Sequence, residues 1–160
     1  MKKFFSGTIG SILLFALAGF GVYLGNIELQ SYWGRQAVRN TGLPVLTLAE
    51  AVKKAKAEDK LVLVDVSAIW CGTCRRLDNE VFSSKEVREE LKRRYVFSRI
   101  EYESEEGQEF INKRNVKGFP NLWVLDSEGR DVRRLRVLFD PSEFAAQLRQ
   151  IRIGIPEASL

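Results

Sequence analysis

The chain has 160 residues, with 25 Lys and Arg, 21 Asp and Glu, two cysteines and no histidine. Without histidine it cannot form a Ser-His-Asp triad, a Cys-His dyad or an imidazole metal site, and two cysteines cannot supply a four-thiolate zinc site, so we expect no bound metal. The hydrophobic fraction of 45% fits a globular protein, and a net charge of +4 is too small to indicate nucleic-acid binding.

Residues 1–27 are predicted to be a membrane anchor or a signal segment. No charged residue occurs from Phe4 to Ile27, and two lysines precede this run. As a helix, residues 4–24 would rise about 31 Å, which matches a hydrocarbon core of roughly 30 Å and exceeds the ~7–15 apolar residues of a signal peptide. This length favours an uncleaved anchor, whereas residues 16–18 have the small-x-small form of a signal cleavage site.

The leading lysines should stay in the cytoplasm, which sends the rest of the chain across the inner or cytoplasmic membrane. We therefore expect the remainder on the periplasmic or extracytoplasmic side, as a single-pass protein or, after cleavage, as a secreted one. All acidic residues lie at or beyond Glu28, so the exported part, without Lys2 and Lys3, is nearly neutral.

The rest of the chain divides into three predicted segments. Residues 28–44 form a linker that either continues the anchor helix or acts as a spacer, and Gly42-Leu43-Pro44 ends any helix there. Residues 45–152 form the folded domain, and residues 153–160 form a C-terminal tail.

The first half of the domain is predicted to contain three helices and two strands. Thr47 and Glu50 have the spacing of a capping box ahead of a helix over 48–57. The run 61–66 is almost wholly apolar and rich in β-branched residues, which is typical of a strand covered on both faces. In chain order there follow a helix from the Trp70-Cys71 turn to about Glu80, a helix capped by Ser83 and Glu86 that runs to about Arg94, and a second core strand over 95–100.

The second half is predicted to contain a helix, two strands and a final helix. These are a helix over 105–114 that ends at Asn115, a strand over 121–125, a turn over 126–129, a strand over 132–139 and a helix from Asp140 to about Ile151. Asp140 is the expected N-cap of the last helix and Pro141 its first residue. The order βαβ followed by ββα indicates an α/β sandwich around one mixed sheet.

Both cysteines of the chain fall in one motif, Trp70-Cys71-Gly72-Thr73-Cys74, directly after the buried strand and at the start of a helix. A thiol at a helix N-terminus meets unpaired N–H groups and the positive end of the helix dipole, which lower its pKa, so Cys71 is the expected attacking thiol. Cys74, one turn along, can attack a mixed disulfide, release the substrate and close the Cys71–Cys74 bond. The alternatives for this spacing are half of a zinc site and a purely structural disulfide.

Two segments, 62–74 and 116–120, resemble the active-site strand and loop and the second signature of the thioredoxin superfamily, and the likeness spans roughly residues 45–152. The resemblance implies a thioredoxin-like three-layer α/β sandwich, with a central mixed sheet flanked by helices, preceded here by one transmembrane helix. It also implies that the Phe119–Pro120 bond is cis and lies beside Cys71, where backbone groups pair with a substrate strand. The redox-active disulfide is then the only cofactor that we expect.

The residues around the cysteines have specific expected roles. Asp65 stands in an otherwise apolar strand, so it is neutral or partnered there unless it faces solvent at an edge; by resemblance to the buried aspartate of thioredoxins it accepts the Cys74 proton. Trp70 covers the sulfurs and offers a contact surface, or has a structural role only. Arg75 either adds a positive field near Cys71 or is simply solvated. The expected substrate-binding residues are Trp70, Gly72, Thr73, Phe119 and Pro120.

Within the superfamily, residues 80–83 and Val87 make the chain more similar to the C-terminal domain of the periplasmic thiol:disulfide interchange protein DsbD than to cytosolic thioredoxin. Thr73 stands where thioredoxin has proline, and no histidine or cation lies between the cysteines to stabilise the thiolate, which favours a reductant.

The leading hypothesis is a membrane-anchored extracytoplasmic thiol:disulfide oxidoreductase that reduces disulfides of exported proteins, such as apocytochrome c. Its electrons would come from a transmembrane donor of the DsbD/CcdA type, because the chain has no nicotinamide or flavin motif. The alternatives are an oxidase or isomerase of exported proteins, and a binding or assembly module with an incidental redox pair.

Overall fold

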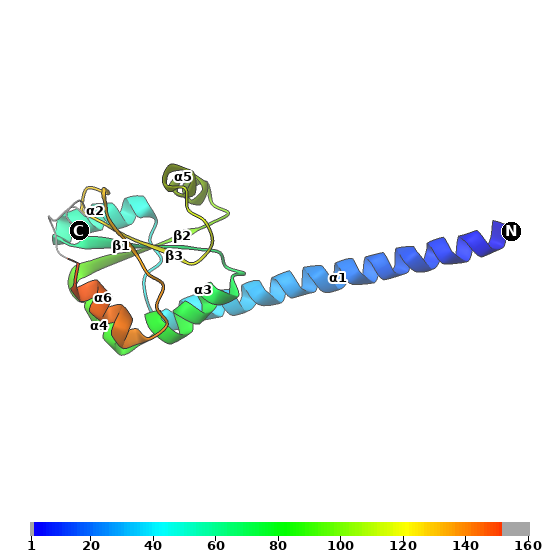
Figure 1. Ribbon diagram of the computed structural model, residues 1–160, viewed down its shortest axis with the longest axis horizontal. Coiled ribbons are helices and arrows are strands. Elements are labelled where there is room, and N and C mark those ends of the chain that lie inside the picture. The colour runs from blue at the N-terminus through cyan, green and yellow to red at the C-terminus, as the bar shows by residue number, and fades with distance from the viewer. Residues whose placement is uncertain (1, 152–160) are drawn as a thin grey trace.

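A long N-terminal helix projects from an α/β domain in the computed structural model, which describes residues 2–151, with side chains from residue 10 onward (Figure 1). This helix, α1 (Lys2–Thr41), is long and apolar enough to cross a membrane within the part that is described. It does not stop after the apolar run, because residues 28–41 continue it, which is the first of the two alternatives for the linker. Gly42, with a φ of 64°, and Pro44 then end the helix.

The domain contains its helices and strands in the predicted order. Its elements are α2 (Leu48–Glu58), β1 (Leu61–Ser67), α3 (Gly72–Leu77), a π-helical turn η1 (Asp78–Phe82), α4 (Lys85–Arg94), β2 (Tyr95–Glu101), α5 (Glu105–Arg114), β3 (Asn121–Leu125), β4 (Asp131–Leu135) and α6 (Pro141–Arg149). The helix after the cysteines therefore turns into a π-helical segment near its predicted end instead of simply stopping.

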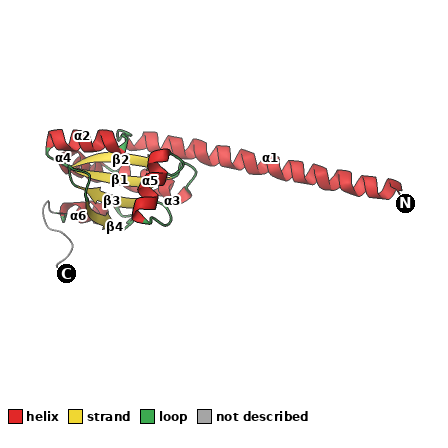
Figure 2. Ribbon diagram, turned by 90° about the horizontal axis from the view of Figure 1, so that it is seen from above, coloured by secondary structure: helices red, strands yellow, loops and turns green. Residues whose placement is uncertain are grey.

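The four strands form one mixed sheet in the order β2-β1-β3-β4 (Figure 2). β1 runs parallel to β2 and antiparallel to β3, and β4 is antiparallel to β3. β1 is a central strand, as its apolar sequence predicts, and all seven of its residues are buried. The carboxyl end of β1 therefore lies inside the sheet, and the cysteine loop begins there.

Different helices cover the two faces of the sheet, so the domain is a three-layer sandwich. On one face, β1 contributes alternate residues that pack with α2 and α5: the buried set is Ala51, Ala55, Val62, Val64, Val66 and Phe110. On the other face the intervening residues of β1 pack with α3, η1, α4 and α6: this set includes Leu61, Leu63, Leu77, Phe82, Leu91 and Phe144. Because side chains alternate along a strand, Asp65 belongs to the second face, together with the helix that follows the cysteines.

Two of the predicted helix caps are confirmed and one is wrong by a residue. Thr47 and Glu50 form the capping box of α2, and the Asp140 side chain accepts from the first turn of α6. The cap of α4 is Ser84, whose Oγ accepts from the backbone of Val87, and not Ser83. Ser83 keeps helical dihedrals because its N–H still donates to carbonyls of the preceding turn.

The last strand is shorter than the predicted 132–139. β4 ends at Leu135, which pairs with Leu122 near the start of β3, so the residues beyond it have almost no strand left to pair with. The backbone of Arg136 instead binds the side chain of Gln147 on α6, with its N–H and its carbonyl each 3.1 Å from that amide. The final helix also ends slightly early, at Arg149.

Candidate active site

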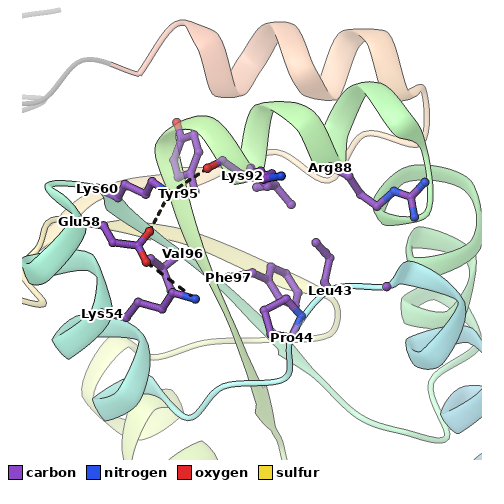
Figure 3. A pocket seen from close by; sticks show the side chains of 12 residues that line it. Leu43, Pro44, Lys54, Glu58, Lys60, Arg88, Lys92, Tyr95, Val96 and Phe97 are labelled. Carbon is purple, nitrogen blue, oxygen red and sulfur yellow. Dashed lines mark hydrogen bonds and ion pairs between the residues drawn. The ribbon is translucent and has the colours of Figure 1, made fainter.

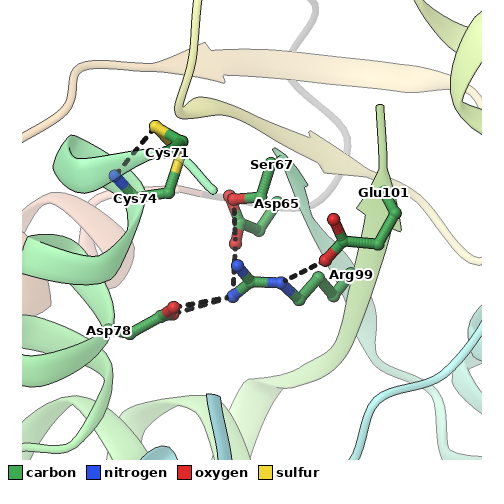
Figure 4. Close-up of a disulfide and its surroundings, with 7 residues drawn as sticks. All are labelled: Asp65, Ser67, Cys71, Cys74, Asp78, Arg99 and Glu101. Carbon is green, nitrogen blue, oxygen red and sulfur yellow. Dashed lines mark hydrogen bonds and ion pairs between the residues drawn. A yellow bond between two sulfur atoms is a disulfide. The ribbon is translucent and has the colours of Figure 1, made fainter. Parts of the chain in front are cut away.

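The two cysteines form a disulfide at the point where the chain leaves β1 and enters α3 (Figure 4). Cys71 is the N-cap of α3, and its Sγ accepts a hydrogen bond from the backbone N–H of Cys74 at 3.2 Å. Cys74 is buried, whereas Cys71 is only half-buried. The sulfur that faces a helix N-terminus is thus also the accessible one, which is the arrangement expected for an attacking thiol.

The segment that precedes β3 lies beside this loop. The Phe119–Pro120 peptide bond is cis, as the resemblance implies. Asn121, the next residue, pairs with Val66 of β1, so Pro120 sits next to the end of the strand from which the cysteine loop starts. The Phe119 ring contacts the Tyr102 ring, with 4.8 Å between the centroids. The ring of the residue before the cis proline thus packs onto the domain and is partly buried.

Trp70 stands at the rim of the site and is 41% exposed. Its Nε1–H donates to the carboxylate of Glu103 at 2.7 Å, which directs the indole ring toward the loop after β2. Gly72 and Thr73, between the cysteines, are exposed as well. Three of the predicted contact residues, Trp70, Gly72 and Thr73, are thus accessible beside the half-buried Cys71, whereas Phe119 is half-buried and Pro120 is buried. The role of all five in substrate binding stays a prediction.

Asp65 is buried and partnered, so the alternative of a solvated edge position is wrong. Its side chain is 1% exposed. Its carboxylate accepts from Ser67 Oγ at 2.9 Å and lies 3.3 Å from the guanidinium of Arg99. In the parallel pairing of β1 and β2, Asp65 and Arg99 occupy the same register position, which brings the two side chains together on one face.

Arg99 joins Asp65 to two further carboxylates (Figure 4). Its Nη1 donates to Asp78 at 2.8 Å, and its Nε donates to Glu101 at 3.1 Å. Asp78 follows α3 directly, and its N–H donates to the carbonyl of Cys74, so it lies one helical turn beyond that cysteine. The buried Cys74 therefore lies one helical turn before a member of a cluster that contains three carboxyl groups and one guanidinium.

Burial sets the protonation of this cluster. It raises the pKa of Asp78 to about 6, against the opposing effect of Arg99, and it raises the pKa of Asp65 and of Glu101 for the same reason. Burial disfavours the charge of Arg99 too, yet Asp65 and Asp78 hold its pKa above the ordinary value. One cation faces three carboxyl groups, so the cluster can hold a proton near neutral pH and exchange it.

Arg75 is not simply solvated, because α1 binds it. Its Nη1 donates to Gln30 at 2.7 Å, and its guanidinium lies 5.3 Å from the centre of the Trp33 ring. The Cβ atom of any side chain at Gly72 would lie 3.9 Å from the other guanidinium nitrogen, so the charge still borders the redox motif. The part of α1 that follows its apolar run is thus a neighbour of the site.

Sequence reasoning missed several residues that the fold brings here: Gln30, Trp33, Asp78, Arg99, Glu101 and Glu103. One signal was available, because Asp65 and Arg99 are charges of opposite sign in two strands predicted to be buried. Nothing local marked Asp78, which stands in a helix where carboxylates usually face solvent. Within residues 2–151, no cluster of three or more His, Cys, Asp or Glu side chains is arranged to hold a metal ion.

A separate pocket lies between α2, α4 and β2, and none of its lining residues belongs to the redox motif (Figure 3). Three of its four basic side chains, all but that of Lys92, have partners within the described part of the chain. Lys54 and Lys60 both pair with Glu58, and Arg88 donates to the carbonyl of Thr41. The pocket therefore offers little free charge for a ligand.

The site now allows a comparison with known proteins. The thiol:disulfide interchange protein DsbD of Tatumella citrea is 30% identical over 101 residues, which are 61% of this chain and 18% of that protein. The protein of the same name from Pseudomonas fluorescens is 27% identical over 154 residues, 89% of this chain and 26% of its own length. The chain thus spans less than a third of these curated relatives.

The comparisons with solved structures and with protein families also find thioredoxin-like proteins. The solution structure of a thioredoxin from Thermus thermophilus is 28% identical, with a TM-score of 0.62, and the match covers 68% of this chain and 86% of that one. The family described as "Thioredoxin-like domain" matches residues 48–152, which include the cysteine pair, the Asp65–Arg99 pair and the cis proline. The chain therefore belongs to the thioredoxin-like family, and its relatives include thiol:disulfide interchange proteins.

Proposed function

We propose that this protein is a membrane-anchored thiol:disulfide oxidoreductase that reduces disulfides of exported proteins on the extracytoplasmic side. One observation carries the proposal: the Cys71–Cys74 disulfide lies at the start of α3, with one sulfur accessible and the other buried. The relatives named for thiol:disulfide interchange support the reaction class. The uncharged run of α1, preceded by Lys2 and Lys3, supports the anchor and its orientation.

The reaction begins from the reduced protein. The Cys71 thiolate attacks one sulfur of the substrate disulfide, which forms a mixed disulfide and expels the other substrate sulfur as a thiolate that takes up a proton. Cys74 then loses its proton and attacks the Cys71 sulfur, which expels the second substrate sulfur as a thiolate and closes the Cys71–Cys74 disulfide; this thiolate takes up a proton from the solvent. Two electrons and two protons pass to the substrate. Asp65 and Asp78 are the proposed acceptors of the Cys74 proton, because both are buried carboxyl groups on the face of the sheet that α3 covers.

The electrostatics around the cysteines support reduction as the direction. The carboxyl groups of the Arg99 cluster outnumber its single cation, and negative charge near a thiol disfavours the thiolate. No cation lies between the cysteines, and the Arg75 guanidinium, which borders Gly72, is shared with Gln30 and Trp33 of α1. A reduced form that is weakly stabilised has a low reduction potential, which suits a donor of electrons.

Reduction of exported proteins requires a source of electrons outside the cytoplasm. Each turnover leaves the Cys71–Cys74 disulfide, which needs two electrons before the next. A transmembrane dithiol donor of the DsbD/CcdA type fits this need, and apocytochrome c is one candidate among the exported substrates.

Two measurements test this function. Equilibration of the purified protein with glutathione should give a Cys71–Cys74 potential below that of the glutathione couple; a value well above it would instead indicate an oxidase or isomerase. The variant Cys74→Ser should accumulate mixed disulfides through Cys71 with exported proteins. The matched control, Cys71→Ser with Cys74→Ser, should trap none. If this double variant retains full biological activity, the domain is a binding module and the proposal is wrong.

A further inference from the structure

The juxtamembrane part of α1 packs directly against the redox loop. Residues 28–41 extend beyond the uncharged run of the anchor, and one face of this segment is buried against the domain, with small side chains at every third or fourth position: Ser31, Gly34, Ala37 and Thr41. At Gly34 the two backbones meet. A Cβ atom there would overlap the carbonyl oxygen of Ile69 and lie 2.9 Å from its carbonyl carbon.

The helix holds the redox motif on both sides of Cys71. Ile69, against Gly34, precedes this cysteine by two residues, and Arg75, bound by Gln30 and stacked over Trp33, follows it by four. Helix and loop are thus connected by a backbone contact, a hydrogen bond and a cation–π contact. A rotation of the domain about its anchor would break all three, so the site keeps one orientation relative to α1.

This orientation turns the cysteines toward the anchor. In Figure 1, the start of α3 lies at the edge of the domain from which the free part of α1 projects. Ile27 is the last residue of the uncharged run, and Gly34 is seven residues further along, which is a rise of about 10 Å. The headgroup layer on each side of a bilayer is roughly 5–8 Å thick, so the redox loop would lie just above it.

Exposed aromatic side chains mark the same edge. Tyr32 and Trp33 on α1 are 53% and 43% exposed, and Trp70 in the redox loop is 41% exposed. Beyond α1, Trp70 and Val45 are the exposed large hydrophobic residues in the described part of the chain. Tyrosine and tryptophan favour the membrane–water boundary, which agrees with a redox edge that lies at the membrane surface.

We infer that residues 28–41 are a rigid spacer that holds Cys71–Cys74 at the membrane surface for exchange with a membrane-embedded protein dithiol. The inference rests on the proposed function, which has two partners, the exported substrate and the electron donor. The contact of α1 with the redox loop serves the exchange with the electron donor. A thiolate of that donor attacks Cys71 Sγ, and Cys74 leaves as a thiolate and takes up a proton. The second donor thiol then attacks the first and loses its proton, Cys71 leaves and is protonated, and the donor becomes a disulfide.

Insertions between Ile27 and Glu28 in the full chain test this spacer. Seven added residues of an Ala-rich helix raise the site by about 10 Å and rotate it by only about 20°, so every contact of α1 with the domain is kept. The matched control is a Gly/Ser insertion of equal length at the same place, which lets the domain return to the surface. Cells of the source organism are oxidised with diamide, and recovery of the Cys71–Cys74 dithiol is followed by thiol alkylation and gel shift.

We expect the helical insertion to slow recovery about tenfold or more, because a stiff spacer of the wrong length removes the effective concentration of the donor, and the flexible insertion to keep most of the wild-type rate. Equal recovery for the helical insertion and the wild type would overturn the inference, since the partner would then not be confined to the surface. A separate measurement isolates the chemistry. If the purified wild-type disulfide does not exchange with dithiothreitol, the proposed oxidoreductase function fails, whatever the insertions do.

Discussion

Replacing Gly34 by alanine should destabilise the protein, although alanine is the better helix former. In an exposed helix the change stabilises by roughly 0.5–1 kcal/mol. Here the new methyl group would overlap the Ile69 carbonyl oxygen, with the carbonyl carbon at 2.9 Å and Ile69 Cγ1 at 3.3 Å. Two of these three atoms belong to the backbone of the redox loop, so neither a rotamer change nor a flexible side chain can relieve the overlap.

The magnitude follows from the balance of these two effects. Overpacking of a close contact costs about 1–3 kcal/mol, which exceeds the gain in helix propensity, so we expect a net loss of about 1–2 kcal/mol. The matched control is Gly25→Ala in the same helix, where no heavy atom lies within 4 Å of the added Cβ.

Urea unfolding of both variants in detergent, followed by tryptophan fluorescence, gives the free energy of unfolding of the domain. Amide hydrogen exchange over residues 28–41 reports the docking of α1. We expect Gly34→Ala to lower the first and to lose protection in the second, while Gly25→Ala leaves both near the wild type. A Gly34→Ala protein as stable as the Gly25→Ala control, with protection retained, would refute the close contact of α1 with the redox loop.

Three further changes test the site and its surroundings. Asp78 keeps its proton up to a pKa of about 6 when folded, against 3.8 when unfolded, so its contribution to stability is full below pH 3.8 and is lost as the pH rises through about 6. The free energy of unfolding of the wild type relative to Asp78→Asn, measured by urea unfolding, should therefore fall by about 3 kcal/mol between pH 3.8 and 7. A constant offset between the two proteins reflects lost hydrogen bonds. A difference that does not change with pH would contradict the raised pKa of the buried carboxyl group. Asp65→Asn should slow the attack of Cys74 on a mixed disulfide by about tenfold or more, with the circular dichroism spectrum retained, and unchanged stopped-flow rates would argue against proton transfer to Asp65. Gly107→Ala should destabilise by about 1–3 kcal/mol in urea, because its Cβ would overlap the last carbonyl of β2; a stability equal to or above the wild type would show that α5 can move away.

Much of the fold could be predicted because its signals are local. The capping box at Thr47, the N-cap at Asp140 and the apolar run of β1 each depend on residues within one element, and each is found as expected. The errors lie at ends that depend on neighbours. β4 stops at Leu135 because β3 offers almost no further partner, and α4 begins at Ser84 because the preceding π-helical turn still holds Ser83.

The candidate site divides in the same way. The cysteine pair and the proline of the cis bond are contiguous motifs, so the chain itself reveals them. The cluster around Arg99 joins residues from β1, β2 and η1, and it needs both the register of two strands and the packing of a helix turn over them. The sequence predicted Asp65 as a site residue, and Arg99, a charged residue in the neighbouring buried strand, could have been predicted as its partner. No local pattern indicated Asp78.

The sequence by itself determined that this protein carries one redox pair, in a thioredoxin-like frame, behind a helix long enough to span a membrane. The chemistry and the element types depend on residues close together in the chain, where side-chain identity is sufficient. Only the tertiary structure decided that the buried aspartate is held by Arg99 and that α1 contacts the cysteine loop through Gly34 and Arg75. These contacts join residues 34–45 positions apart, and their existence depends on the packing of whole elements, which no local pattern encodes.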